Sequence, residues 1–285
     1  MKHFYVIMNP DKKGARETAE QIREFLTARG AVCLIGRGEK VDWQAGKHYT
    51  DSAMVPKETE CVITLGGDGT LIQAARDLSG RNLPILGINR GTLGYLTQVS
   101  RTEDIESALS ALLNDDYKLE ERMMLSGSAF RDGKEIYRDI ALNEIVITRG
   151  EYLKMLQFKV YVNGEFLTEY RADGLIAATP TGSTAYNLSA GGPIIVPDSK
   201  MLVLTPICSH ALNARSIVLS AEDKIRIEIV GQEGISQAAV FDGDSAVSLL
   251  PGDWIDMERA QIKTILVKLK NLSFLDNLRN KMAGI

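Results

Sequence analysis

Short apolar runs alternate with helical patterns from residue 4 to residue 112. The apolar runs predict buried strands at residues 4–9, 31–35, 61–65 and 84–89. Apolar residues that recur every three or four positions predict helices at residues 15–26, 70–78 and 105–112. The stretch between residues 36 and 57 is mostly polar and predicts a loop. Strands that alternate with helices are typical of a parallel sheet with crossover helices.

One helix start carries a local signal of its own. Ser100 and Glu103 have the spacing of a capping box, in which each side chain bonds the backbone N–H of the other residue. We therefore expect Ser100 to cap the helix that contains Ile105 and Leu112.

From about Tyr117 the pattern changes to strands joined by turn residues. The segments RDGK at 131–134 and VNGE at 162–165 predict hairpins. Further strands are predicted at residues 217–220, 224–230 and 263–269, which indicates a mostly antiparallel sandwich. The segment FLDNLRNKM predicts a short helix that returns to the first domain.

The predicted fold class is an α/β N-terminal domain with a parallel sheet plus an all-β sandwich C-terminal domain. The first domain is predicted over residues 1–116, joined by residues 271–285, and the second over residues 117–270. A chain of 285 residues with 45% hydrophobic residues is long enough for two such cores.

The charge pattern excludes one class of partner. Thirty-three basic and 37 acidic residues give a formal net charge of −4, without a long run of either sign. The sequence has no basic run that would bind a nucleic-acid backbone, so a small molecule or another protein is the expected partner.

The cysteines and the apolar segments point to a reducing compartment. Cys33, Cys61 and Cys208 are odd in number and form no Cys-x-x-Cys pair, which argues against a disulfide framework or a thiolate zinc site. The apolar run near Met1 is too brief for a signal-peptide core, and no segment reaches membrane-spanning length. We expect a cytoplasmic protein without a membrane partner.

The segment GGDGT follows a predicted strand and is the first candidate for chemistry. Gly66 and Gly67 let the backbone approach a ligand closely, and amides at a helix start attract phosphate oxygens. Asp68 would repel phosphate unless it handles a magnesium ion or accepts a proton from an attacking hydroxyl. The structural alternative is a tight turn with a helix-capping Asp.

The second candidate is the segment at residues 171–197, which is rich in glycine and small hydroxyl residues. It fits neither a regular strand nor a regular helix, and it suits a backbone wrapped around a ligand. Thr184 and Ser189 would supply hydrogen bonds and Tyr186 an apolar wall. The alternative is a glycine-rich connector between strands.

The third candidate is ALNEIVITRG at 141–150, which places Asn143 and Glu144 inside an apolar strand. A buried carboxylate is costly without a partner, so Glu144 is predicted to face a ligand, a cation or the edge of a cleft. An edge-strand salt bridge is the alternative. Of the scattered histidines, only His210 lies near the ligand-like half of the chain.

Several familiar site motifs are missing from the sequence. It contains no Gly-x-x-x-x-Gly-Lys-Ser/Thr loop, no complete Gly-x-Gly-x-x-Gly fingerprint, no Gly-x-Ser-x-Gly elbow and no His-Glu-x-x-His. The three candidate stretches therefore carry the functional interpretation.

Together, GGDGTL, NRGTLGYL, LNEI and DGLIAATPTGSTAYNLSAGGP make the chain resemble the NAD kinase family. Lipid kinases of the diacylglycerol type and phosphofructokinases carry loops similar to GGDGT, so the TPTGSTAY block and the Asn-Glu pair decide between them. The resemblance implies transfer of a phosphoryl group from ATP, another nucleoside triphosphate or polyphosphate to the 2′-hydroxyl of the adenosine ribose of NAD, giving NADP. It also implies a divalent metal, Mg²⁺.

The resemblance assigns roles to particular positions. Asp68 matches the family's proton acceptor and also contacts NAD, and Tyr95 stands where an aromatic residue stacks on adenine. Lys154 and Cys208 fall in or near the implied pocket. The other positions that match nucleotide-contacting residues are Gly69, Asn143, Glu144, Arg171, Asp173, Thr184, Ala185, Tyr186, Asn187, Leu188 and Ser189.

Asp244 departs from the family pattern, since related sequences often have an amide after FDG. The family architecture implies a site between the two domains and a homodimer or homotetramer in which a neighbouring subunit completes the pocket. Two other functions stay open: a lipid kinase, which needs an acyl-accommodating cleft or a membrane-facing patch, and a non-catalytic dinucleotide sensor.

Overall fold

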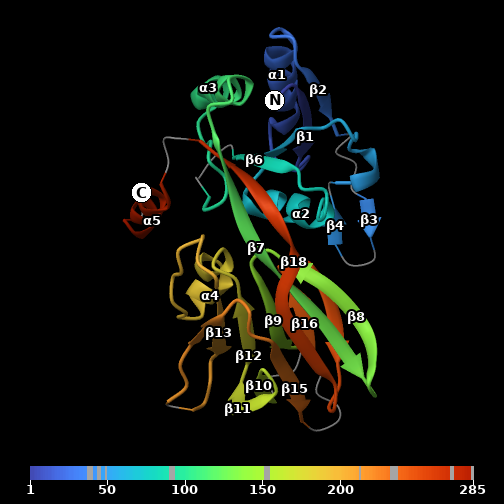
Figure 1. Ribbon diagram of the computed structural model, residues 1–285, viewed down its shortest axis with the longest axis vertical. Coiled ribbons are helices and arrows are strands. Elements are labelled where there is room, and N and C mark those ends of the chain that lie inside the picture. Colours follow the sequence, from blue (N-terminus) through green and yellow to red (C-terminus); the bar gives the residue numbers. More distant parts are fainter. Residues whose placement is uncertain are drawn as a thin grey trace. The chain divides into compact units, whose positions relative to one another are not determined.

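The chain folds into two compact units, Met1–Arg122 with Lys263–Ile285 and Met123–Ile262, in a computed structural model (Figure 1). The predicted domain boundaries, at residues 116/117 and 270/271, stay a prediction. The residues that the structure describes are 1–36, 41–43, 46–48, 50–89, 94–150, 155–211, 213–231, 237–269 and 273–283.

The first unit is built on a parallel sheet with the strand order β6-β5-β1-β2. The end of β18 extends it by pairing in parallel with β6, where Ile265 lies opposite Pro84. The inner strands β1, β5 and β6 are almost wholly buried because their sequences are mainly apolar, as in the run CVITL, whereas β2 exposes Val32 and Leu34. The bounds are β1 His3–Met8, β2 Val32–Ile35, β5 Cys61–Leu65, β6 Pro84–Ile88 and β18 Trp254–Lys268.

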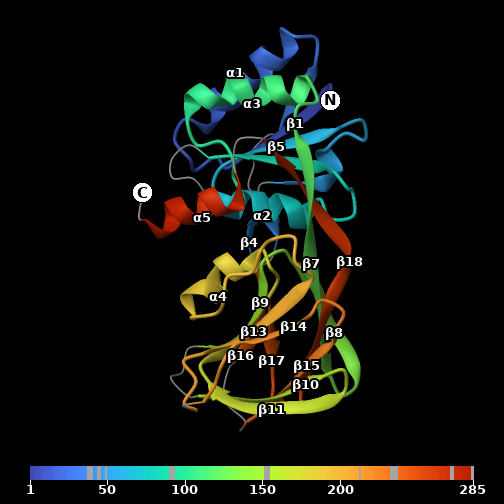
Figure 2. The same cartoon turned by 60° about the vertical axis from the view of Figure 1, so that its left-hand side comes forward.

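Helices cover both faces of this sheet (Figure 2). Helices α1 and α3 bury their apolar stripes in one core with β1, β2, β5 and β6, and α2 lies on the opposite face. The predicted helical spacing is confirmed, since Ile22 and Leu109 are among the fully buried side chains. The bounds are α1 Ala15–Thr27, α2 Asp68–Asp77, α3 Thr102–Leu113 and α5 Phe274–Met282.

Two local expectations about this unit are wrong. Ser100 does not cap α3: the N-cap is Arg101, and it makes no side-chain cap hydrogen bond. The bridge between Ile88 and Val99 fixes the chain just before the helix, so a contact distant in sequence sets where α3 begins. In the described part of the predicted loop at residues 36–57, the strands β3 Val41–Trp43 and β4 Gly46–His48 pair, followed by the 3-10 turn η1 Ser52–Met54.

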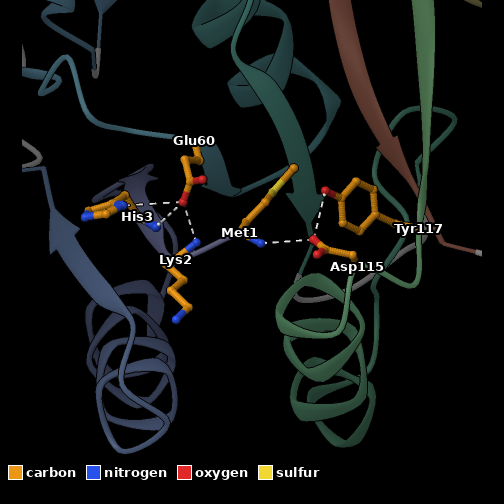
Figure 3. A network of polar contacts seen from close by, with 6 residues as sticks. All are labelled: Met1, Lys2, His3, Glu60, Asp115 and Tyr117. Carbon is orange, nitrogen blue, oxygen red and sulfur yellow. Dashed lines mark hydrogen bonds and ion pairs between the residues drawn. The ribbon is translucent and has the colours of Figure 1, made fainter.

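Polar contacts tie the starts of neighbouring elements together in this unit (Figure 3). One carboxylate oxygen of Glu60, just before β5, accepts the backbone N–H groups of Lys2 and His3 at the start of β1. These backbone hydrogen bonds, the one from Lys2 above all, lower the pKa of Glu60. The amino group of Met1 lies 3.0 Å from Oδ1 of Asp115, just after α3. The network therefore fixes the amino ends of two adjacent parallel strands.

The second unit is an antiparallel sandwich, as its alternating sequences predict. One sheet has the order β14-β13-β12-β9-β16-β17, and the other is formed by β11, β10, β15, the first part of β18, β7 and β8. Their inner faces share one core that includes Phe158 and Phe241, both fully buried. The remaining bounds are β7 Lys118–Arg131, β8 Lys134–Ala141, β9 Glu144–Arg149, β10 Leu156–Val162, β11 Glu165–Ala172, β12 Gly174–Ala178, β13 Met201–Ile207, β14 Ile217–Ser220, β15 Ile225–Val230, β16 Gln237–Phe241 and β17 Ser245–Leu249.

The predicted hairpin turns are confirmed. Asp132 and Asn163 each begin a turn between antiparallel strands, with φ of 51° and 53°. Asp242 begins a third turn of the same kind, between β16 and β17, with φ of 51°. Each of the three is followed by a glycine with positive φ, which is the pairing that tight hairpin turns require.

Candidate functional site

Asp68 is the first residue of α2, and its carboxylate is bound by a second stretch of backbone. Oδ2 accepts the N–H of Tyr95 at 2.7 Å, and Oδ1 accepts those of Leu96 at 3.2 Å and Thr97 at 3.0 Å. The cap position belongs to Gly67, so the helix-capping alternative does not describe this carboxylate. The side chain is half-buried and held in one orientation by three donors.

The backbone at residues 94–97 is itself shaped to receive this carboxylate. A Cβ at Gly94 would clash with Oδ1 of Asp68, so only glycine allows this close approach. Nδ2 of Asn277 in α5 donates to the Gly94 carbonyl oxygen at 3.1 Å. Nζ of Lys281 lies 5.7 Å from the centre of the Tyr95 ring. Helix α5 therefore supports the segment that holds Asp68.

The start of α2 can also receive an anion. Gly67 at the cap and the exposed Gly69 in the first turn leave the backbone N–H groups of this turn uncovered by Cβ atoms. Such a helix start attracts phosphate oxygens through its partial positive charge. The first unit thus combines a phosphate-attracting backbone with a fixed carboxylate.

In the second unit, Asn143 and Glu144 lie at the start of β9, in the middle of a sheet. Strand β9 pairs with β12 on one side and β16 on the other, so the edge-strand salt bridge is excluded. Glu144 is the first residue of the strand, and Asn143 precedes it rather than lying inside it as predicted. The chain turns here because β8 has ended at Ala141.

Glu144 is a buried carboxyl group with an unused oxygen. Only 7% of the residue is exposed, and Oε2 has no hydrogen-bond partner among the described residues. Burial, followed by the charge of Asp242, raises the pKa of Glu144 to about 8, while the backbone N–H of Tyr186 acts in the opposite direction. A group of this kind is typical of a functional site.

Asp242, which the sequence analysis did not single out, holds the backbone of Asn143 and Glu144. Its carboxylate accepts the N–H groups of Leu142 at 2.7 Å, Asn143 at 2.8 Å and Glu144 at 3.1 Å. Its own N–H donates to the Glu144 carbonyl oxygen at 3.0 Å. The available signal was its place in an Asp-Gly hairpin turn.

The segment at residues 171–197 is more regular than predicted. Its first part forms β12, which lies between β9 and β13 and is buried along its whole length. In the sequence GLIAA only Ile176 is a strong strand former, so burial on both faces contributes more to its conformation than propensity. It continues in a 3-10 turn, η2 Gly182–Thr184, and a short helix, α4 Tyr186–Ser189.

Hydrogen bonds from Thr179 to backbone carbonyl oxygens join this segment to the Asn143 turn. Thr179 donates from its N–H to the Asn143 carbonyl oxygen at 2.8 Å and from Oγ1 to the Leu142 carbonyl oxygen at 2.6 Å. A Cβ at Gly182 would clash with the same Asn143 oxygen. The two predicted stretches therefore form one body within the second unit.

The residues of α4 divide into exposed and buried members. Tyr186, Leu188 and Ser189 are exposed, and Thr184 and Ala185 are partly exposed. Asn187 is fully buried, and its amide bonds the carbonyl oxygens of Ser183 and Pro193 and the hydroxyl of Thr205. The side chain of Asn187 therefore fixes this segment from inside, and a nucleotide contact at this position would have to use the backbone.

Three further predicted residues lie near one another at one end of the second unit. Arg171 is in β11, Asp173 comes just before β12, and Cys208 comes just after β13. The N–H of Asp173 donates to the Ile207 carbonyl oxygen, and the Arg171 carbonyl oxygen accepts the N–H of His210. The ion pair of Asp173 is with Arg149, at 3.1 Å, so Arg149 joins this group although the sequence did not indicate it. Cys208 is exposed.

Lys154 lies outside the described residues. Within the described ranges, no group of three or more His, Cys, Asp and Glu side chains is placed to hold a metal ion. No helix in the described part of the chain has the length and hydropathy needed to cross a membrane.

Comparison with known proteins gives the same family over both halves of the chain. Residues 4–117 match the ATP-NAD kinase N-terminal domain, and residues 142–269 match the ATP-NAD kinase C-terminal domain. An NAD kinase from Lachnospira eligens is 43% identical over 294 residues, covering 99% of this chain and all of the relative. An NAD kinase from Agathobacter rectalis is 42% identical over 287 residues, covering 100% and 99%.

Two solved structures share the fold over the whole chain. Yeast NADH kinase in complex with NADH has a TM-score of 0.85 at 25% identity, covering 100% of this chain and 88% of the other. An NAD kinase from Archaeoglobus fulgidus in complex with ATP has a TM-score of 0.78 at 26% identity, covering 99% of both chains. The predicted combination of an α/β unit and a β-sandwich is confirmed.

Proposed function

The chain belongs to the NAD kinase family, and we propose that it transfers the terminal phosphoryl group of ATP to the 2′-hydroxyl of the adenosine ribose of NAD, with Asp68 as proton acceptor. The observation that carries the role of Asp68 is its fixed carboxylate beside the start of α2. The products are NADP and ADP.

The hydrogen bonds of Asp68 suit this role. An ionised carboxylate has about four acceptor positions, and three backbone N–H groups use two on Oδ1 and one on Oδ2. The remaining position, on Oδ2, is available to a ribose hydroxyl. The three donors also hold the carboxylate in one orientation, so it can orient the hydroxyl, which is the main requirement of catalysis by positioning.

The proton is taken late in this proposal. Phosphoryl transfer usually passes through a loose transition state, in which the nucleophile needs orientation more than full ionisation. As the bond from the ribose oxygen to phosphorus forms and the bond to ADP breaks, the hydroxyl proton passes to Oδ2 of Asp68. The backbone N–H groups at the start of α2 would stabilise charge on the donor phosphates.

The second unit supplies dinucleotide contacts. We assign them to Asn143, Glu144, Asp173, Tyr186 and the neighbouring residues that match the family motifs. Asn143, Glu144 and Tyr186 are supported by their place at the start of β9 and on the exposed side of α4. Asp173 lies beside Arg149 at the other end of β9, so its assignment rests on the family motif alone. Adenine stacking is assigned to Tyr95, which is partly exposed.

The finer parts of the proposal rest on the family. Mg²⁺ enters as part of the ATP complex, because this ion is commonly held by substrate phosphates with few protein carboxylates. A homodimer or homotetramer and a cytoplasmic location are also proposed on the family resemblance. The relatives favour NAD kinase over a lipid kinase, and an activity assay distinguishes an enzyme from a dinucleotide sensor.

The test is direct. Purified protein is incubated with ATP, Mg²⁺ and NAD, and NADP is measured with an NADP-specific dehydrogenase. Parallel reactions with NADH or polyphosphate identify the preferred acceptor and donor. NADP formation that depends on both ATP and Asp68 is the expected result, and binding of NAD without any NADP formation would make the protein a sensor instead.

A further inference from the structure

Two neighbouring carboxyl groups at the start of β9 differ sharply in their hydrogen bonds. Asp242 accepts three backbone N–H groups, from Leu142, Asn143 and Glu144. Glu144 is buried, and its Oε2 has no partner among the described residues. Three charge-assisted donors stabilise the ionised form of Asp242, whereas among the described residues the backbone N–H of Tyr186 is the one donor that favours an ionised Glu144.

Within the part of the second unit that the structure describes, the strands paired with β9 and the helix α4 contain no Lys or Arg. Strands β12 and β16 have the sequences GLIAA and QAAVF, and α4 has the sequence YNLS, with Tyr186 as its titratable residue. The turn after β16 carries Asp242 and Asp244. Burying a second negative charge beside Asp242 would be costly, so Glu144 retains a proton. The raised pKa of Glu144, about 8, agrees with this argument.

We propose that Asp242 is a positioning residue that holds the Asn143–Glu144 turn and keeps Glu144 neutral, so that Glu144 presents Oε2–H to the dinucleotide as a hydrogen-bond donor. The group it recognises is then an acceptor, such as a ribose oxygen or an adenine ring nitrogen. The effect of Asp242 on the protonation of Glu144 is inferred from this structure alone, while the identity of the ligand rests on the proposed function.

This arrangement predicts a dependence on pH that a purely structural turn would not show. Glutamine has the shape of a neutral glutamic acid and can donate a hydrogen bond, so Glu144→Gln retains binding and loses the pH dependence. Asp242→Asn removes the neighbouring charge, so Glu144 ionises at a lower pH. The matched control is Asp132→Asn, because exposed Asp132 begins an equivalent Asp-Gly turn with the same φ of 51°.

The first experiment needs no ligand. Denaturant unfolding is measured from pH 5 to pH 9 for the natural protein and the three variants. We expect the natural protein to lose stability relative to Glu144→Gln as pH rises to about 8, and this loss to be smaller and to end at lower pH in Asp242→Asn. Parallel curves for the natural protein and Glu144→Gln would overturn the proposal, even if Asp242→Asn did not fold.

The second experiment measures the Kd of NAD by calorimetry over the same range. We expect the Kd of the natural protein and of Asp132→Asn to rise by about tenfold per pH unit above about pH 8, since one proton is lost. Glu144→Gln should show no such rise, and in Asp242→Asn the rise should begin at lower pH. A loss of affinity in Asp242→Asn by the same factor at every pH would show a structural role only and overturn the proposal.

The two proposals fail in different ways. If the natural protein forms no NADP and binds no NAD, the proposed function is wrong, and the unfolding curves still decide the relation between Asp242 and Glu144. If NADP forms but the unfolding curves are parallel, only the inference about the two carboxyl groups is wrong.

Discussion

Replacement of Asp68 by Asn tests both roles of this carboxylate at once. The amide retains one oxygen, which can still accept the N–H groups of Leu96 and Thr97, but its NH₂ group cannot accept the N–H of Tyr95. A hydrogen bond to a charged group contributes about 1.5–3 kcal/mol, and the half-buried position reduces this to about 1–2 kcal/mol of local stability. The fold should therefore persist while the segment at residues 94–97 loosens.

Turnover should fall by much more than stability. Loss of a positioned proton acceptor typically costs about 10²- to 10⁴-fold in rate, or about 3–5 kcal/mol of transition-state stabilisation. The assay is the initial rate of NADP formation at saturating ATP and NAD, with the Kd of NAD measured separately. Hydrogen exchange of the peptide that contains Tyr95 reports the loosening of the backbone.

Asp104→Asn is the matched control, because Asp104 is an exposed acidic residue in the first turn of α3. A kcat of Asp68→Asn within about threefold of the natural value would refute the role of proton acceptor, given the expected loss. A large rise in the Kd of NAD with kcat unchanged would instead assign Asp68 only to shaping the segment at residues 94–97.

Three further outcomes are expected. Burial, and then the charge of Asp242, raises the pKa of Glu144 to about 8, so the folded protein holds a proton that the unfolded chain releases and the free energy of unfolding falls as pH rises from about 5 to 8. Urea unfolding at each pH should show that Glu144→Gln removes this loss of stability, which is on the order of 5 kcal/mol. Asn277→Ala removes a hydrogen bond to the segment at residues 94–97 and should cost about 0.5–1.5 kcal/mol and lower kcat severalfold, with the exposed Asn280→Ala as control; equal rates for the two variants would contradict this. Cys208 should be the one thiol that iodoacetamide labels in the native protein, because the other two are buried and burial raises their pKa, and NAD should slow the labelling; labelling at the same rate with and without NAD would place Cys208 outside the site.

Local sequence signals were sufficient for most of the fold. The apolar runs give the four strands β1, β2, β5 and β6 and part of the sandwich, although β12, β13, β16 and β17 were not predicted. Asp-Gly and Asn-Gly pairs such as Asp132-Gly133 give the hairpin turns, since these residues readily adopt positive φ. The error at Ser100 has the opposite origin. The start of α3 depends on the bridge between Ile88 and Val99, which the sequence around Ser100 does not contain.

The site shows the same division. Asp68 and Glu144 were recognisable because a charged residue beside an apolar strand is costly to bury unless it has a partner or a function. Their partners were not, because the donors to Asp68 lie 27 to 29 residues away and Asp242 lies 98 to 100 residues from the amides it accepts. Such pairings are decided by the packing of whole sheets, so one sequence alone does not reveal them.

The discontinuity of the first unit has a consequence for biosynthesis. Its last segment, from Lys263 onward, is translated only after the entire sandwich unit. That segment provides the N–H of Leu269, which donates to Gln98 at 2.8 Å, and the Asn277 contact to Gly94. A nascent chain that still lacks these residues leaves the backbone around Asp68 without its support. Phosphoryl transfer should therefore begin only after the segment that carries Leu269 and Asn277 has been translated and has packed against residues 94–98.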